Sequence, residues 1–421
     1  MQHFGQIPST GTITEDRLSN GLRVFSNHVA HVNSITLGIW INSGSREDPS
    51  EIAGLSHFLE HAVFKGTLSR DYITIARCIE QVGGYIDAYT TKENTCIYIR
   101  CLKTHSELAF DLLADLVCNP VFPEEEIEKE KEVVIEEIHG IQDTPEELIF
   151  DQFDDLAFPE HPLGPAILGT EKSVERVTTE TLHSFMHQHY VAPNMLITAV
   201  GNMEHDEIMR QAEKSFRVPN QANSSPGNIR TFEQNDYRAF VDRRKKPFGQ
   251  AHLLYGRAVP RNDSFFYTLL LLNTILSGGM SSMLNLELRE QRPLAYNVYS
   301  SLTFFDDATL LNIYAGTESE HTEEALSIIK NILSVDNLSG ISQEELLAAK
   351  NRLLGSMIME TEQMTQRMSK AARDIFYFGK AVSLEEKISG VNEITRESLG
   401  DAALYLQRAE ASTLVYEPEE E

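Results

Sequence analysis

The stretch Asp48–Phe64 (DPSEIAGLSHFLEHAVF) carries the most informative pattern in the chain, H-x-x-E-H, formed by His57, Glu60 and His61. On an α-helix with 3.6 residues per turn, residues four apart lie one turn apart on the same face, so both imidazoles can reach one metal ion. Glu60 projects near that face, where a carboxylate can act as a general base. The order is the reverse of H-E-x-x-H, with the acid beside the second histidine.

The flanking residues predict a buried helix near Ala53–Phe64. Asp48 offers an N-cap, Pro49 suits the first helical position and Glu51 the third. Apolar residues occur on several sides of the helix: Leu55, Phe58, Leu59, Ala62 and Val63. A buried helix that carries His, Glu and His needs a partner for these polar groups, and a metal ion supplies one. The alternative is a pair of core histidines held by ordinary hydrogen bonds.

A catalytic zinc takes three protein ligands and keeps one open position. The best source of a third ligand is the acidic helix expected from about Glu124 to Ile141. Its apolar residues form one stripe: Ile127, Val134, Ile138 and Ile141. Glu130 and Glu137 fall within that stripe, where a carboxylate is costly without a counter-charge. The alternative is a helix with an ordinary solvated acidic face.

Composition bounds the class of protein. The formal net charge is −27, with 36 Lys and Arg against 63 Asp and Glu. Such a surface disfavours nucleic acid and anionic membrane as partners. Two interpretations of the charge stay open: it keeps the protein in solution, or acidic walls attract basic peptides. No run of apolar residues is long enough to span a bilayer, and no targeting signal is recognisable, so we expect a cytoplasmic protein.

The chain divides into two halves of similar pattern. We predict an N-terminal zinc-binding domain at 1–217, a linker at 218–235 rich in Asn, Gln, Ser, Pro and Gly, and a homologous domain at 236–421. Each half opens with strand-like segments, at Leu22–Asn27, Ser34–Asn42, Arg238–Asp242 and Gln250–Gly256, and then runs into an apolar helix. The second of these helices, near Phe265–Leu276, lacks H-x-x-E-H. We therefore expect two α+β halves related by duplication, with one Zn²⁺ per chain.

HFLEH followed by Glu130–Glu137 (EKEVVIEE) resembles the inverted-zincin M16 peptidases, such as pitrilysin and the mitochondrial processing peptidase. The resemblance implies that Glu137, at the family's spacing from His61, is the third zinc ligand. It also implies that Glu130, seven residues earlier, supports a ligand. Glu136 is the neighbouring alternative to Glu137, but it points away from the stripe.

Two further segments are similar to parts of that family. Gly83–Thr90 (GGYIDAYT) resembles the edge strand to which substrate adds as a β-strand, which implies Asp87, Ala88, Tyr89 and Thr90 as the substrate strand. Asp87 departs from the usual asparagine. The glycine-rich Ser277–Ser282, with Arg289 and Tyr296, resembles a loop and an Arg/Tyr pair that the family brings to the active site from the second half. Taken alone, the pair is an ordinary surface arginine and core tyrosine.

The resemblance implies a zinc endopeptidase that hydrolyses extended or unstructured peptides between two halves arranged as a clamshell. We expect a homodimer, and a heterodimer with a metal-free partner stays open. The rival hypotheses are a non-catalytic peptide-binding or structural subunit of the same fold, and a metal hydrolase that acts on a non-peptide amide. The sequence leaves the physiological substrate undefined.

Overall fold

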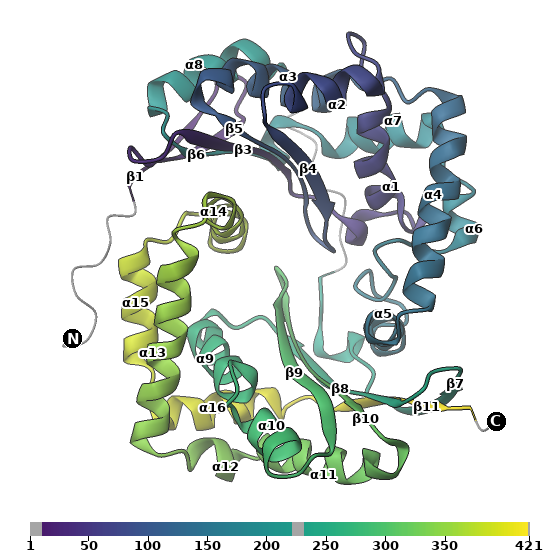
Figure 1. The fold of residues 1–421 in the computed structure, drawn as a ribbon, viewed down its shortest axis with the longest axis vertical. Helices are drawn as coiled ribbons and strands as arrows, with labels where there is room; N and C mark the ends of the chain where they lie inside the picture. The colour runs from purple at the N-terminus through teal and green to yellow at the C-terminus, as the bar shows by residue number, and fades with distance from the viewer. Residues whose placement is uncertain (1–10, 221–230, 420–421) are drawn as a thin grey trace. The chain divides into compact units, whose positions relative to one another are not determined.

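The computed structural model describes residues 11–220 and 231–419, which form two compact units (Figure 1). Neither unit is continuous in sequence. The first contains the described residues up to 139 together with 165–220 and 359–382, and the second contains 140–164, 231–358 and 383–419. Most of the predicted linker, 221–230, lies outside the described residues. The domain boundaries predicted from the sequence, 1–217 and 236–421, differ in kind from this division and stay a prediction.

The first unit is built on a mixed sheet of six strands. They are β1 (Thr12–Arg17), β2 (Arg23–His28), β3 (Ser34–Ile41), β4 (Tyr85–Thr90), β5 (Thr95–Leu102) and β6 (Met195–Gly201). Their order is β1-β2-β6-β3-β5-β4, in which β2 and β6 are parallel and all other neighbours antiparallel. Almost every residue of the central strands β3 and β6 is buried, because both faces of these strands are covered. As predicted, β4 is an edge strand.

Helices cover both faces of this sheet. The elements of the unit are α1 (Leu55–Ala62), α2 (Tyr72–Glu80), α3 (Ser106–Cys118), α4 (Glu124–Gln142), α6 (Glu171–Val174), α7 (Thr179–His189), α8 (His205–Ser215) and α14 (Met364–Phe378). On one face, α1, α3 and α8 contribute to the main core with residues such as Phe58 and Phe110. On the other, Met368 of α14 packs with Trp40 and Leu196 in a separate cluster.

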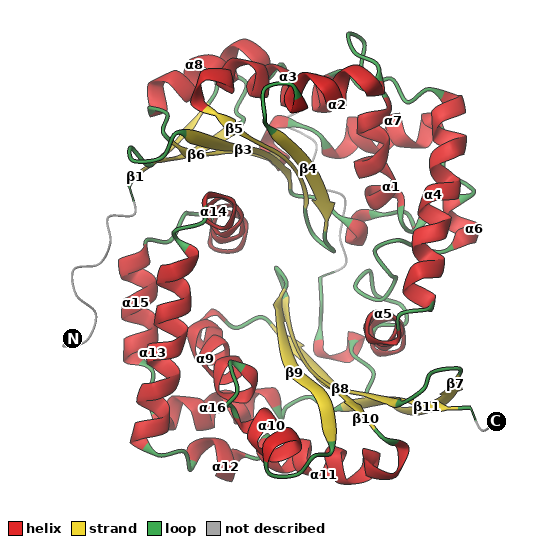
Figure 2. Cartoon of the chain, viewed as in Figure 1, coloured by secondary structure: helices red, strands yellow, loops and turns green. Residues whose placement is uncertain are grey.

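The second unit repeats the same plan. Its strands are β7 (Val241–Lys246), β8 (Ala251–Pro260), β9 (Ala295–Phe304), β10 (Ala308–Thr317) and β11 (Ser412–Pro418), in the order β7-β11-β8-β10-β9. Its helices are α5 (Pro145–Ala157), α9 (Phe266–Ser277), α10 (Met283–Asn285), α11 (Thr322–Ile332), α12 (Val335–Ser339), α13 (Gln343–Glu360), α15 (Leu384–Glu393) and α16 (Arg396–Leu406). Helices and strands are thus mixed in both units, which confirms the α+β class (Figure 2).

The two sheets have matching topology. The order β2-β6-β3-β5-β4 corresponds strand for strand to β7-β11-β8-β10-β9, and the parallel pair occurs at the same place in each. This agreement confirms the predicted similarity of the halves. Each half also supplies one helix to the sheet of the other: α5 packs on β8 and β11, and α14 packs on β3 and β6.

The start of α1 differs from the prediction. The predicted capping by Asp48, Pro49 and Glu51 was wrong, because a short 3₁₀ turn occupies Ser50–Ile52 and the helix begins at Leu55. Gly54 precedes it with φ 95°, a left-handed conformation that favours glycine. The Asp48 carboxylate still satisfies the helix start from a distance, since it accepts hydrogen bonds from the Gly54 N–H (2.8 Å) and the Ser56 N–H (2.9 Å).

The four cysteines, Cys78, Cys96, Cys101 and Cys118, are all free thiols. Within residues 11–220 and 231–419, no helix has the length and apolar character needed to cross a membrane.

Candidate metal centre

Helix α1 places its two histidines on one face, as the motif predicts. The His57 and His61 rings lie one turn apart with centroids separated by 4.7 Å. Phe58 and Leu59, which point to other sides of the helix, are completely buried in the main core. The core therefore fixes the direction in which both imidazoles point.

Helix α4 lies beside α1 and brings Glu137 to the imidazoles (Figure 1). Glu137 Oε2 is 3.8 Å from His57 Nε2 and 3.7 Å from His61 Nε2. One ligand atom from each of the three side chains lies within 4.8 Å of the other two. The structure thus brings together the three residues that the sequence assigns to the metal.

Glu130, two helical turns before Glu137 on α4, contacts the second histidine. It is 5% exposed and accepts a hydrogen bond of 2.8 Å from His61 Nδ1. Lys65, which follows His61 by one turn, forms an ion pair with the other oxygen of Glu130. With its Nδ1 bonded in this way, His61 presents Nε2 toward Glu137, as metal-binding histidines held by a carboxylate do.

The electrostatics of the two histidines differ. Burial, together with the nearby His61, lowers the pKa of His57 to about 4, so its ring is neutral at physiological pH. For His61, burial acts against the charged form, but the hydrogen bond to Glu130 and the charges of Glu137 and Glu60 outweigh it and raise the pKa. Burial likewise disfavours the charged form of Glu130, yet His61 and Lys65 lower its pKa overall.

These residues fit a zinc ion. Two imidazole nitrogens and one carboxylate oxygen form a donor set typical of catalytic zinc. With metal–ligand distances near 2.1 Å, neighbouring ligands of a tetrahedral ion lie about 3.4 Å apart, close to the measured separations. His57 Nδ1 is buried without a hydrogen-bond partner among the described residues, so nothing in them holds this ring by a second bond. An ion at Nε2 would compensate this polar ring for its burial.

A second group of potential ligands, Glu318, Glu320 and His321, occurs just after β10. Both glutamates are exposed, and the three residues come from one short turn. Exposed acidic groups commonly gather in this way without an ion. This group therefore carries no functional argument.

Glu60 lies on α1 between the two histidines and is 9% exposed. Its Oε2 accepts a hydrogen bond of 2.7 Å from Thr90 Oγ1, at the end of β4. Burial raises the pKa of Glu60; the Thr90 hydrogen bond and His61 oppose this shift, whereas the charges of Asp87 and Glu137 add to it. A carboxyl group with a raised pKa is suited to accept and return a proton near neutral pH.

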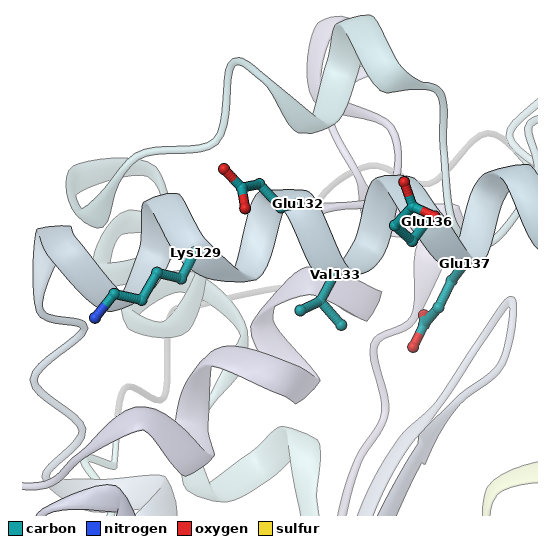
Figure 3. A pocket seen from close by; sticks show the side chains of 5 residues that line it. All are labelled: Lys129, Glu132, Val133, Glu136 and Glu137. Atoms are coloured by element: carbon teal, nitrogen blue, oxygen red, sulfur yellow. The ribbon is translucent and has the colours of Figure 1, made fainter.

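Next to Glu137, the exposed side of α4 lines an open hollow of about 640 Å³. Its lining side chains are Lys129, Glu132, Val133, Glu136 and Glu137 (Figure 3). Figure 3 shows Val133 and Glu137 leaving the helix on one side and Glu132 and Glu136 on the other. Glu137 therefore lies at the border between the partly buried imidazoles and an open surface.

The sequence analysis missed three residues that shape this site. Lys65 could have been found, because it lies one turn after His61 and therefore on the same side. Thr90 was assigned to the substrate strand but not to Glu60, since the contact depends on how β4 passes α1. Asp48 was placed at the wrong helical position, as described above.

Comparison with known proteins decides the family. Residues 23–171 match the model of Insulinase (Peptidase family M16), and residues 176–353 match that of the Peptidase M16 inactive domain. An uncharacterised zinc protease of Bacillus subtilis is 34% identical over 92% of this chain and 94% of that relative. Another, of Mycobacterium leprae, is 36% identical over 92% of this chain and 87% of its own length. The chain belongs to peptidase family M16.

Solved structures support the M16 fold. A protease from Helicobacter pylori has a TM-score of 0.88 at 20% identity, over 97% of this chain and all of that one. An M16 inactive domain from Pseudomonas fluorescens has a TM-score of 0.85 at 22% identity, over 97% of this chain and 99% of that one. In this M16 chain the H-x-x-E-H motif and Glu137 all fall in the first matched segment, and the second segment has no such motif.

The predicted Arg/Tyr pair of the M16 chain lies in the second unit. Arg289 belongs to a π-helical turn, Leu286–Glu290, and its guanidinium carbon is 5.8 Å from the centre of the Tyr296 ring. Tyr296 is 83% exposed, so the ordinary interpretation of it as a core residue was wrong. The two side chains are therefore close to each other, and their role at the metal centre stays a prediction.

Proposed function

We propose that this M16 chain is a zinc-dependent endopeptidase, with zinc held by His57, His61 and Glu137. The observation that carries the proposal is the convergence of three ligand atoms, from two helices, beside the buried carboxyl group of Glu60. Relatives at 34% and 36% identity that are named zinc proteases support it.

A zinc ion in this site would supply Lewis-acid chemistry, lowering the pKa of water and polarising a carbonyl group. Glu60 accepts the proton of the attacking water and returns it to the leaving amine. Thr90 holds one oxygen of Glu60 through its 2.7 Å hydrogen bond, which orients the other oxygen toward the reacting groups. Glu130 and Lys65 keep the His61 ring in place throughout.

The substrate side of the proposal follows from β4 and from the family resemblance. An extended peptide would add to the free edge of the sheet at Asp87, Ala88, Tyr89 and Thr90. Arg289 would anchor a carbonyl or carboxylate of the peptide, and Tyr296 would stabilise the oxyanion, inside a chamber formed by both halves. The proposal also includes cytoplasmic location and a homodimer, with a heterodimer as the alternative.

A non-catalytic subunit of the same fold is the competing function. The description "inactive domain" belongs to the model that matches residues 176–353, whereas all four motif residues lie in 23–171. The complete set of ligands and base therefore favours catalysis.

The test combines metal content with cleavage of an unstructured, internally quenched peptide. The Glu60→Gln variant should retain zinc and lose about 10²–10⁴-fold in kcat, because the general base is gone. The Glu137→Gln variant should lose both zinc and activity. Glu136→Gln, which changes the neighbouring acid on the same helix, should retain its zinc.

Two results would contradict the proposal. Cleavage by Glu60→Gln at the wild-type rate would exclude Glu60 as the base. Retention of zinc by Glu137→Gln together with its loss from Glu136→Gln would show that the ligand is the adjacent glutamate.

A further inference from the structure

The edge of β4 is prepared to pair with another strand. The Thr91 N–H donates to the Asn94 carbonyl (2.8 Å), which closes the hairpin between β4 and β5. Hydrogen-bonded and non-hydrogen-bonded pairs alternate along an antiparallel ladder. Thr91 is in a hydrogen-bonded pair, so Thr90 and every second residue before it direct their backbone groups away from β5. Ile86, Ala88 and Thr90 therefore present their N–H and C=O groups to the free edge.

This edge leads directly to the candidate base. Thr90 is the last residue of β4 and its hydroxyl bonds to Glu60. Asp87 lies three residues earlier, which corresponds to about 10 Å along a strand. A peptide paired with β4 would thus place residues beside Asp87 within about three positions of the bond to be cleaved.

The carboxylate of Asp87 reaches the free edge itself. Its Oδ1 accepts a hydrogen bond of 2.9 Å from the Ala88 N–H, one of the groups that point outward. Its Oδ2 accepts hydrogen bonds from the hydroxyls of Tyr85 (2.7 Å) and Tyr98 (3.2 Å). These bonds fix the carboxylate at the place where a partner strand would run.

Asp87 has hydrogen-bond donors but no counter-charge. In the described part of the chain, no Lys, Arg or His is within ion-pair distance of it. Among the described residues, this carboxylate accepts hydrogen bonds from the three uncharged donors named above. Tyr85, which is 54% exposed, and Tyr98 stand beside it with ring centroids 6.1 Å apart. Aromatic rings of this kind pack against the aliphatic stem of Lys or Arg and attract its charged end.

We propose that Asp87 is a specificity-determining residue, selecting extended peptides that carry a Lys or Arg side chain next to it. The proposal rests on the function proposed above. When the peptide strand pairs with β4, its carbonyl takes over the Ala88 N–H and frees Oδ1 of Asp87 for the cation. The tyrosine hydroxyls retain Oδ2, so the carboxylate stays in position. Cross-strand neighbours share a face of the sheet, which brings the cation and Asp87 to the same side.

The experiment separates selection from turnover. Two fluorescent peptides are identical except for Lys or its uncharged analogue norleucine at one position, which is moved along the peptide. Binding is measured by fluorescence anisotropy in the zinc-loaded Glu60→Gln protein, with and without the Asp87→Asn substitution. Cleavage is measured in the two corresponding proteins that retain Glu60. Asp401→Asn, an exposed acid of α16, removes the same charge elsewhere and serves as the matched control.

We expect the lysine peptide to bind on the order of fivefold more tightly than the norleucine peptide at its best position. The preference should disappear in Asp87→Asn, persist in Asp401→Asn and weaken as salt is raised. Asp401→Asn should bind both peptides as the parent protein does.

The inference is overturned if the preference for lysine survives in Asp87→Asn. It is also overturned if the parent protein binds both peptides equally or binds neither. If the protein that retains Glu60 binds peptides with charge selectivity but does not cleave them, the inference about Asp87 stands and the proposed peptidase activity is refuted. If it cleaves peptides without charge selectivity, the peptidase activity stands and the inference about Asp87 is refuted.

Discussion

The two halves share a topology, yet the corresponding helices α1 and α9 differ in the side chains they carry. Helix α1 follows the second strand of the matched set in the first half, and α9 follows the second strand in the other. In α1 the sequence LSHFLEHA buries a carboxyl group and partly buries two imidazoles, whereas α9 (FYTLLLLNTILS) carries no ionisable side chain except a tyrosine hydroxyl.

This difference shows what the fold itself does not require. The apolar α9 fills the same topological position, so the architecture is compatible with a centre that has no histidine or glutamate. Buried polar groups without compensation cost free energy, and breaking their partnerships costs more. The polar side chains of α1 and α4 are therefore better explained by a catalytic function than by a need of the fold. Their cost in folding free energy would be offset by a bound ion.

The largest effect is expected from a double substitution that makes α1 as apolar as α9. In His57→Leu/His61→Leu the zinc site is removed, and peptide cleavage should fall below detection. The metal-free variant should nevertheless melt no lower than metal-free wild type, because apolar residues replace poorly compensated buried polar ones. Calorimetry of both proteins after chelation measures this. A variant that fails to fold would show that the histidines are structural.

A smaller effect is expected from the support of His61. Glu130→Gln keeps the size of the side chain but removes the charge that His61 and Lys65 contact. Zinc affinity should fall about 10–100-fold, as for other residues that hold a metal-binding histidine. Competition with a chelator of known affinity measures it. Unchanged affinity would mean that His61 does not need this partner.

The smallest effect concerns the start of the two helices. The half-buried carboxylate of Asp48 holds the start of α1, whereas the side chain of Asn262, which is also half-buried, caps the turn before α9. Burial raises the pKa of Asp48 to about 7, although hydrogen bonds from Ser56 and Gly54 oppose this. An acid whose pKa is raised on folding binds more protons in the folded state, so its contribution to stability decreases as pH rises from about 4 to 7.

Asp48→Asn should remove that decrease, while its side-chain oxygen still accepts the N–H of Gly54 or Ser56. Relative to wild type, the variant should gain stability with rising pH by at most about 1.4 kcal/mol per pH unit. Urea unfolding of the two chelated proteins at pH 5, 6 and 7 compares them. Parallel stability curves would contradict the role given to burial.

The sequence predicted the centre better than its surroundings. Helical periodicity was sufficient to bring His57 and His61 together, and the apolar stripe was sufficient to turn Glu130 and Glu137 toward them. The topology of each half could only be suggested by the order of strand-like and apolar segments. The edge position of β4 came from the family resemblance, because six residues of alternating pattern do not reveal their neighbours in a sheet.

Other features depend on tertiary structure and were inaccessible. The amphipathic patterns of α5 and α14 indicate a buried face but not the sheet that buries it, so their exchange between halves could not be foreseen. Strand β7 was predicted at Arg238–Asp242 but runs from Val241 to Lys246. Its charged sequence VDRRKK forms a strand because it pairs in parallel with β11 at the edge of the sheet.

The most direct test of the central claim is the position of the metal. Crystals of the zinc-loaded protein should give an anomalous difference peak at the zinc absorption edge on α1 and α4. The account predicts this peak at about 2.0–2.2 Å from His57 Nε2, His61 Nε2 and a carboxylate oxygen of Glu137. A peak only at Glu318, Glu320 and His321, or a zinc ion without Glu137 among its ligands, would contradict the account.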